Sequence, residues 1–212
     1  MVITTSIQNT INSLTKKNIN AYFAETKIAA FELILTFLKE NMTIASGNSL
    51  TLRQIGIFDY LASSENPYFC FINQFEPGIT PEENLKRRKQ GLTADLYLSS
   101  ANAITEDGKI CNIDGKGNRV AALMFGPEKV IIVVGKNKIV KDEHEAWERI
   151  RRTAAPLTAK RLKRTTPCTV VGICQNCNSP ERICRAYSMI DGQMPQDKDR
   201  IHVIIVGEDL GT

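Results

Sequence analysis

Long apolar runs are missing from this sequence. The longest, residues 130–134, has only the length of a strand, whereas a membrane-spanning helix needs about 20 apolar residues. The first residues also lack the basic start and apolar core of a secretory signal peptide. We therefore expect a cytoplasmic protein with no membrane partner.

Histidine and tryptophan are scarce, with two histidines and one tryptophan. His144 stands among charged residues and His202 opens an apolar stretch, so neither is a favoured metal ligand. Internal repeats, low-complexity tracts and linkers are absent as well. Because 42% of the residues are hydrophobic, disorder is excluded. We expect a single domain over residues 1–212.

Positive charge exceeds negative charge by only four. This is too little for a nucleic-acid-binding surface across the whole molecule, and we expect no DNA partner. The excess is concentrated in one run that contains no acid: Arg149, Arg151, Arg152, Lys160, Arg161, Lys163 and Arg164. Such a run is typical of a solvated helix face. It is also compatible with a local anion site or with docking of an acidic protein.

Helical and strand patterns alternate along the chain. Helical spacing predicts N-terminal helices within residues 1–41, including one helix over residues 20–40. Residues 142–152, with acids early and arginines late, predict another helix. Strand patterns cover residues 95–99, 110–113, 120–125, 130–134 and 201–206, and the glycine-rich turn 114–118 joins two of them. The alternation indicates an α/β fold with an open, mostly parallel sheet flanked by helices.

Four of the six cysteines crowd into residues 167–195, which we expect to form an excursion before the last strand. Their spacing is C-x5-C-x2-C-x6-C, at Cys168, Cys174, Cys177 and Cys184. Clustered cysteines in a cytosolic protein favour a metal or redox site over disulfides. The spacing favours an iron–sulfur cluster of the [4Fe-4S] type, because four-cysteine zinc sites usually have two C-x2-C pairs. The alternatives are zinc and reduced thiols without metal, and Cys184 is either a fourth ligand or a residue that faces the core.

Residues 99–108 follow a predicted strand, where α/β folds place their ligands. This loop contains Asn102, Glu106 and Asp107. Glu106 is a candidate base or nucleophile. Asp107-Gly108 is also a common turn signal, and on spacing alone a solvated turn is the favoured interpretation.

Two further loops are suited to bind an anion. Residues 114–119 combine two glycines with Lys116 and Arg119 and can hold a phosphate or carboxylate, although most such turns are plain hairpins. Residues 47–51 lead into a predicted helix whose first N–H groups can face an anion, and helix capping explains Ser49 equally well. No Gly-Lys-Ser/Thr follows, so this is not a Walker loop. The candidate anion-binding residues are Gly47, Ser49, Thr51, Asn102, Asn118 and Arg119.

Several long stretches resemble one known family. Thr93-Ala94-Asp95, residues 99–108 and residues 112–122 look like the LUD domain, the family of lactate-utilisation protein C. The resemblance continues through residues 126–127, 135–138, 149–151 and 154–156, the cysteine segment and residues 206–211. Residues 47–52 resemble the family's G-x-S-x-T-L loop. The similarity is closest to the short, cysteine-bearing branch.

The resemblance implies a fold similar to that of the sugar-phosphate isomerase and CoA-transferase superfamily. It implies a link to the oxidation of L-lactate to pyruvate, in which family members act beside iron–sulfur partner proteins. It raises the weight of five site residues, which are the catalytic candidates Glu106, Asp107 and Asp114 and the anion-binding candidates Asn118 and Arg119. The two anion-binding loops predict a small anionic substrate. Three functions follow as expectations: an iron–sulfur protein that transfers electrons or binds a small carboxylate, a metal-independent isomerase or transferase, and a non-catalytic partner subunit with a structural zinc.

Overall fold

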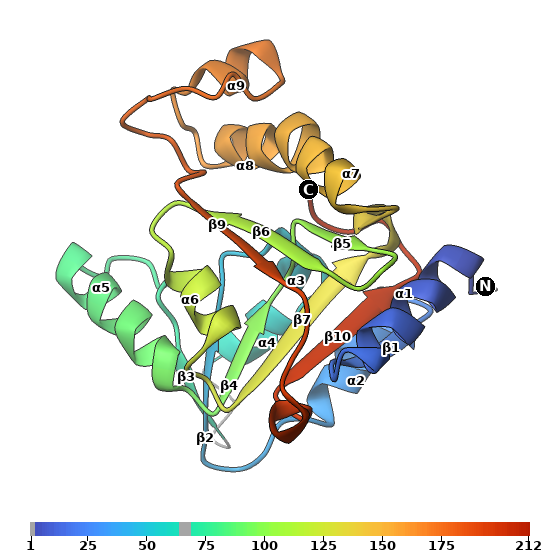
Figure 1. The fold of residues 1–212 in the computed structure, drawn as a ribbon. Helices are drawn as coiled ribbons and strands as arrows, with labels where there is room; N and C mark the ends of the chain where they lie inside the picture. The colour runs from blue at the N-terminus through green and yellow to red at the C-terminus, as the bar shows by residue number, and fades with distance from the viewer. Residues whose placement is uncertain (1–2, 64–68) are drawn as a thin grey trace.

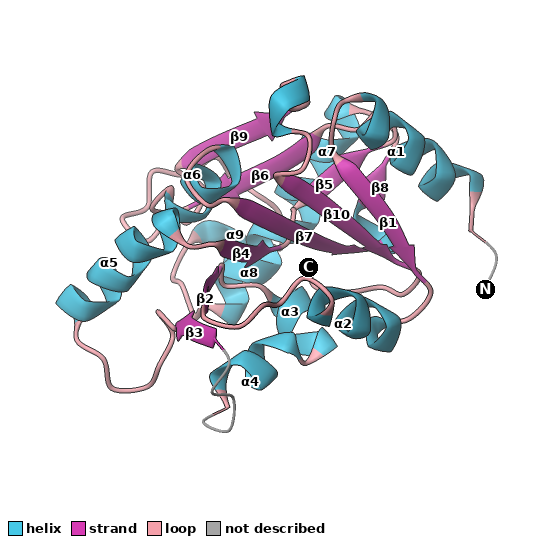
Figure 2. Ribbon diagram, turned by 90° about the horizontal axis from the view of Figure 1, so that it is seen from below, coloured by secondary structure: helices cyan, strands magenta, loops and turns pink. Residues whose placement is uncertain are grey.

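The computed structural model describes residues 3–63 and 69–212, which form two sheets (Figures 1 and 2). The larger sheet has the strand order β1-β10-β7-β4-β2-β3, and all neighbouring strands in it are parallel. Its strands are β1 (Asn20–Ala24), β2 (Met42–Ser46), β3 (Phe69–Ile72), β4 (Leu96–Ser99), β7 (Lys129–Gly135) and β10 (Ile201–Val206).

The smaller sheet has the strand order β8-β5-β6-β9. Strand β6 is antiparallel to β5 and β9, while β5 and β8 are parallel. Its strands are β5 (Ala103–Thr105), β6 (Ile110–Asp114), β8 (Ile139–Val140) and β9 (Ala186–Ile190). Figure 1 shows this sheet between the larger sheet and α7 and α8.

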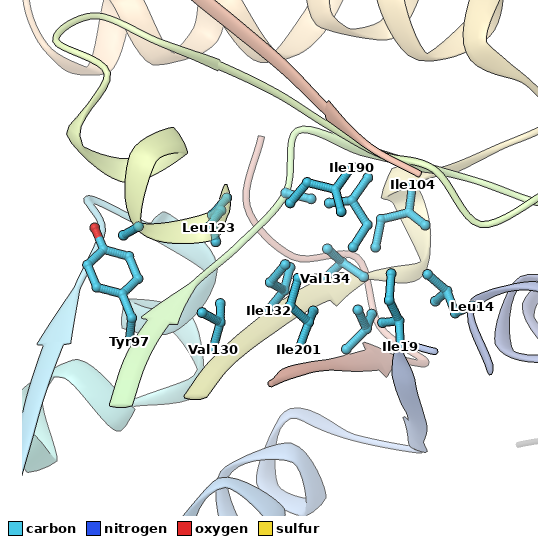
Figure 3. Close-up of a cluster of buried hydrophobic side chains, with 14 of the residues drawn as sticks. Leu14, Ile19, Tyr97, Ile104, Leu123, Val130, Ile132, Val134, Ile190 and Ile201 are labelled. Atoms are coloured by element: carbon cyan, nitrogen blue, oxygen red, sulfur yellow. The ribbon is translucent and has the colours of Figure 1, made fainter. Parts of the chain in front are cut away.

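Helices cover one face of the larger sheet, and helices together with the smaller sheet cover the other. Helices α2 (Lys27–Leu35), α3 (Leu50–Ile55) and α4 (Ile57–Ala62) pack on the first face, where Ile131 and Val133 are buried. The second face meets α1 (Thr5–Lys16), α6 (Asn118–Met124) and the smaller sheet. In Figure 3, Val130, Ile132 and Val134 of β7 project toward Ile104 and Ile190 of the smaller sheet. Because β7 is buried on both faces, its apolar residues are uninterrupted.

A further helical layer covers the outer face of the smaller sheet. It consists of α7 (Glu143–Arg149), a π-helical turn (Ile150–Ala154) and α8 (Ala155–Arg161). Helix α9 (Pro167–Val171) packs on α8, and α5 (Pro81–Gln90) lies near α6 in Figure 1. Short 3-10 turns occupy Gly91–Thr93, Lys136–Lys138 and Pro195–Asp197. Among the helices described, none has both the length and the apolar character needed to cross a bilayer.

The predicted α/β fold with an open, mostly parallel sheet flanked by helices is confirmed. The single helix predicted over residues 20–40 is wrong, because Asn20–Ala24 instead pairs with β10. The side chain of Thr26 then accepts a hydrogen bond from the Ala29 amide and caps α2. The N-terminal region therefore contains a strand between two helices.

The strand predicted over residues 120–125 is also wrong, since these residues belong to α6. The turn 114–118 consequently joins a strand to a helix rather than two strands. The predicted excursion over residues 167–195 contains strand β9, which pairs with β6 and completes the smaller sheet. The helix predicted over residues 142–152 continues to Arg161 through the π-helical turn.

Candidate functional site

A cavity of about 370 Å³ lies beside the carboxyl ends of β2, β4 and β6. Ser49 follows β2, Ser100 and Asn102 follow β4, and Asp114 ends β6. Helix α8 contributes Thr158 and Arg161 to the wall. Open parallel sheets bind their ligands beyond the carboxyl ends of their strands. We refer to this cavity as the strand-end pocket.

The lining of the strand-end pocket is strongly cationic. The described residues that line it include one acidic side chain, that of Asp114, and six basic side chains. The basic residues are Arg88, Lys116, Arg119, Lys138, Arg161 and Arg164. A concave surface lined by charges of one sign focuses the electrostatic field and attracts ligands of the opposite sign. The pocket is therefore suited to a small anion.

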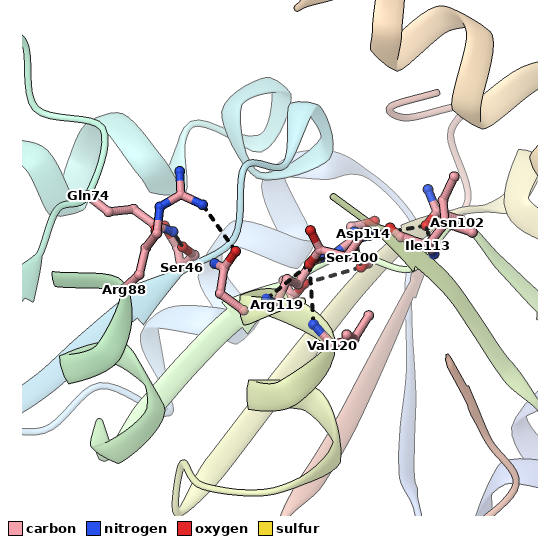
Figure 4. A network of polar contacts seen from close by, with 11 residues as sticks. Ser46, Gln74, Arg88, Ser100, Asn102, Ile113, Asp114, Arg119 and Val120 are labelled. Atoms are coloured by element: carbon pink, nitrogen blue, oxygen red, sulfur yellow. Dashed lines mark hydrogen bonds and ion pairs between the residues drawn. The ribbon is translucent and has the colours of Figure 1, made fainter. Parts of the chain in front are cut away.

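Arg119 is held from several directions (Figure 4). Its guanidinium donates to Asn102 Oδ1 at 3.2 Å and to the Ile113 carbonyl. Asp114 Oδ2 accepts hydrogen bonds from the Arg119 and Val120 amides, and lies 3.7 Å from Arg119 Nε. The same carboxylate thus caps α6 and positions the arginine.

Two further contacts account for the glycine at position 47 and the asparagine at position 118, which both lie close to Arg119. A Cβ atom on Gly47 would lie 3.1 Å from Arg119 Cδ, so a small residue leaves room for the arginine. Arg88 of α5 donates to Asn118 Oδ1 at 3.1 Å and links that helix to the start of α6 (Figure 4). The pocket therefore joins residues that are far apart in the sequence.

Lys138 is buried, with 4% of its surface exposed. Its Nζ donates to Thr51 Oγ1 and Ser100 Oγ, both at 3.1 Å, and to the Ala101 carbonyl at 3.3 Å. Burial lowers the pKa of Lys138 to about 7, and the positive charges of Arg149 and Arg119 act in the same direction. Such an amine exchanges its proton near neutral pH.

Arg161 has unused hydrogen-bonding capacity in the pocket wall. One terminal nitrogen donates to Asn48 Oδ1 at 3.3 Å, while the buried Nε–H has no hydrogen-bond partner among the described residues. Burial, and then the charge of Arg53, lower the pKa of Arg161. Bound anions commonly satisfy guanidinium groups of this kind.

The predicted anion-binding residues gather at the strand-end pocket. Ser49, Asn102, Asn118 and Arg119 line it, as does the predicted catalytic residue Asp114. Gly47 packs against Arg119, and Thr51 accepts from Lys138. Ser49 also caps α3 by accepting from the Leu52 amide, so the predicted helix cap is confirmed, while its role in anion binding stays a prediction.

Glu106 and Asp107 lie outside the strand-end pocket, in the turn between β5 and β6. Glu106 Oε1 accepts a hydrogen bond from Ser6 Oγ at 2.7 Å. Asp107 accepts from Thr105 and pairs with Lys109 at 3.4 Å. The structure does not bring these two carboxylates together with Arg119, and their catalytic role stays a prediction.

The four clustered cysteines are free thiols and partly exposed. Cys174 and Cys184 border one cavity of about 210 Å³, while Cys184 Sγ accepts a hydrogen bond from Arg182 Nε. Cys168 Sγ contacts Thr166 Oγ1 at 3.2 Å. Within residues 3–63 and 69–212, no three Cys, His, Asp or Glu side chains are placed to hold a metal ion. As placed, the thiols do not form a cluster ligand set, and the iron–sulfur assignment of Cys168, Cys174, Cys177 and Cys184 stays a prediction.

Sequence reasoning missed two residues that define the pocket. Lys138 follows a buried strand by three residues, which is a signal for a ligand-side position, but its burial is not readable from a Gly-Lys-Asn-Lys stretch. Arg161 was expected in a mainly solvated basic run. The structure divides this run, because Arg161 lines the pocket and Arg149 is half-buried, whereas Arg151 and Arg152 are exposed.

Fold and site together define an α/β protein with a cationic pocket at the carboxyl ends of its strands. The family model described as the LUD domain matches residues 7–206, and the chain belongs to the LUD domain family. None of the curated proteins matches the sequence.

The solved structures similar to this chain include the following two. A DUF162 family protein from Deinococcus radiodurans has 15% sequence identity and a TM-score of 0.48, over 95% of this chain and 96% of that one. Ribose 5-phosphate isomerase from Plasmodium falciparum has 20% identity and a TM-score of 0.34, over 54% of this chain and 52% of that one.

Proposed function

We propose that this LUD-family protein binds and transforms a small, multiply charged organic anion in the strand-end pocket, as an isomerase or transferase without a metal. The observation that carries the proposal is the excess of six basic side chains over one acidic side chain in a cavity of about 370 Å³. A volume of this size suits a metabolite rather than a macromolecule.

The charge of the lining favours a ligand with more than one negative charge. Arg119 is already partly compensated by Asp114, but Arg161 retains an unpaired Nε–H. Phosphate esters and dicarboxylates offer several acceptor oxygens for such forked donors. Lactate and pyruvate belong to the same broad class of small anions. The lactate role implied by the family resemblance is therefore compatible with the chemistry of the pocket. A ligand with a single carboxylate matches the six basic side chains less well than one with several negative charges.

Two kinds of residue divide the proposed work. Arg88, Arg119 and Arg161 bind and orient the anion. Lys138 supplies a group that can give or take a proton at neutral pH, because its amine is buried near other cations. Ser100 and Thr51 contact this amine and can relay protons to it.

Replacement of Arg161 tests the proposed anion site. We expect Arg161→Met to weaken the binding of inorganic phosphate and citrate by about tenfold or more, because a charged hydrogen bond contributes about 1.5–3 kcal/mol. Isothermal titration calorimetry measures the affinity. Arg152→Met removes the same charge from the same basic run, outside the pocket, and should leave the affinity nearly unchanged. Equal losses in both variants would refute a localised site.

The second candidate function is an iron–sulfur protein that transfers electrons with an iron–sulfur partner. It is favoured by one observation, the common cavity bordered by the free thiols of Cys174 and Cys184. Protein purified without oxygen should then contain about four iron and four sulfide per chain. Cys174→Ser should abolish the visible absorption of the cluster. Colourless protein with about one zinc would instead indicate a structural site.

A further inference from the structure

Lys138 differs from other lysines of the chain in its partners. Lys17 pairs with Asp191 and Lys109 with Asp107, both near the surface. The three groups that contact Lys138 Nζ, by contrast, are two hydroxyls and a carbonyl, all uncharged. A buried lysine is normally paired with an acid. The ammonium form of Lys138 is not paired with an acid by any of these three contacts.

The surroundings of Lys138 accommodate a neutral amine. The hydroxyls of Thr51 and Ser100 can accept from an ammonium, and they can equally donate to the lone pair of an amine. Arg149 and Arg119 both disfavour the ammonium form. A lysine that is desolvated next to other cations has the character of an activated nucleophile.

The backbone of Gly211 packs directly against the Lys138 amine, where no larger residue would fit. A Cβ atom on Gly211 would lie 2.6 Å from Lys138 Nζ and 2.4 Å from Thr51 Oγ1. Gly211 has φ +73°, a conformation that favours glycine. Both Gly211 and Lys138 line the strand-end pocket. Lys138 therefore borders the same cavity as the arginines.

We propose that Lys138 condenses with the carbonyl group of a small anionic oxo compound, whose carboxylate or phosphate is held by the pocket arginines. This inference rests on the proposed function and names the substrate class of the same site. The arginines select the anion, and the amine selects the carbonyl. A ligand must therefore carry both an anionic group and a carbonyl group. Oxo acids and phosphorylated carbonyl compounds meet this requirement, and other anions do not.

The proposed step balances without an oxidant or reductant. The Lys138 nitrogen adds to the carbonyl carbon, a C–N bond forms, and the C=O double bond becomes a C–O single bond. The carbinolamine oxygen then leaves as water, taking both hydrogens of the original amine, and a C=N bond results. Ser100 Oγ and Thr51 Oγ1 lie at hydrogen-bond distance from the nitrogen and can carry these protons. Protonation of the imine adds a positive charge that the anionic group of the ligand offsets.

Reductive trapping tests the proposal with two separate probes, pyruvate and dihydroxyacetone phosphate. Sodium borohydride reduces an imine to a stable secondary amine, which intact-mass measurement counts and peptide mapping locates. We expect one adduct per chain, on Lys138, with at least one probe. The probe that reacts distinguishes a carboxylate ligand from a phosphate ligand.

Two variants and one binding measurement make the outcome decisive. Lys138→Met should abolish trapping, whereas Lys136→Met, two residues away and outside the pocket lining, should retain it. Peptide mapping of the unmodified sequence gives the same answer even if Lys138→Met fails to fold. Adducts spread over surface lysines, or none, would overturn the inference. If phosphate still binds in an Arg161-dependent manner, the proposed anion site survives that failure, and loss of both would overturn both.

Discussion

The residue that most shapes the chemistry of the pocket is a lysine whose partners are all uncharged. Taking an ammonium group out of water is costly, and hydroxyl and carbonyl acceptors compensate for it only in part. Arg149 has a related environment: burial lowers its pKa, and it donates to the carbonyls of Asn137 and Asn102. Lys138 and Arg161 line the strand-end pocket, and Arg149 lies behind its wall in contact with Asn102. A pocket with poorly compensated cations in its lining is suited to bind an anion.

Lys138 should make the stability of the protein depend on pH. Its pKa is about 7 in the folded chain, against an ordinary value of 10.5. Between these values the unfolded chain binds more protons, so the contribution of Lys138 to stability rises as the pH rises through this window. Lys138→Met removes this contribution. Relative to that variant, the free energy of unfolding should increase by up to about 1.4 kcal/mol per pH unit above about pH 7.

Urea denaturation at several pH values measures this dependence. Lys136→Met serves as the control, because it deletes a lysine whose side chain is not buried. A difference between the unmodified protein and Lys138→Met that stays constant from about pH 7 to about pH 9 would contradict the lowered pKa.

Single residues explain which of the predicted site residues lie at the strand-end pocket. Ser49, Asn102 and Arg119 could be predicted because small polar loops after strands are recurrent ligand positions. Lys138 and Arg161 could not, because the sequence shows neither the burial of a lysine nor the side of a helix that faces a cavity. The burial of Lys138 and the orientation of Arg161 depend on contacts between residues far apart in the sequence, such as that of Lys138 with Thr51.

At the scale of secondary structure, α6 is a helix although the composition of its residues favours a strand. Its residues are mostly apolar and include a β-branched valine, which favoured a strand. In the structure Val120, Ala122 and Leu123 are buried, and the Asp114 carboxylate accepts from the first amides of the helix. The capping residue Asp114 precedes the first residue of α6 by four positions, so the pattern of residues 120–125 alone does not reveal it. Strand β9 was missed for a similar reason, because its pairing with β6 is nonlocal.

The cap of α6 should contribute more than an ordinary surface cap. Asp114 accepts two amide hydrogen bonds, pairs with Arg119 and is 15% exposed at its side chain. Asp142 accepts one hydrogen bond from the Glu145 amide at the exposed start of α7. We expect Asp114→Ala to cost about 2 kcal/mol of stability and Asp142→Ala about 1 kcal/mol or less. Urea unfolding of both variants checks this order, and equal costs would show that the additional contacts of Asp114 contribute nothing.

For the whole molecule, the parallel sheet was predictable because β7 is apolar from Val130 to Val134 and β10 is apolar apart from His202. The second sheet was not, since it is assembled from short strands separated by as many as 80 positions, as in the pairing of Ile110 with Ile190. This sheet places Asn102 and Asp114 opposite α8 and thereby closes the pocket. The six basic side chains of the strand-end pocket come from several segments of the chain, so only the complete fold brings them together.

A ligand that neutralises these positive charges should stabilise the whole fold. Pocket residues belong to segments between Asn48 and Thr212, and their cations repel one another when no anion is present. Phosphate at about 100 times its Kd should add about 2.7 kcal/mol of stability, which corresponds to roughly 5–10 °C in Tm. Thermal unfolding in phosphate and in sodium chloride at equal ionic strength measures the gain. A site-specific gain rises with the logarithm of the phosphate concentration above Kd, and it shrinks in Arg161→Met but not in Arg152→Met. A gain that grows in proportion to the phosphate concentration and is equal in both variants would instead indicate general exclusion of the salt from the protein surface.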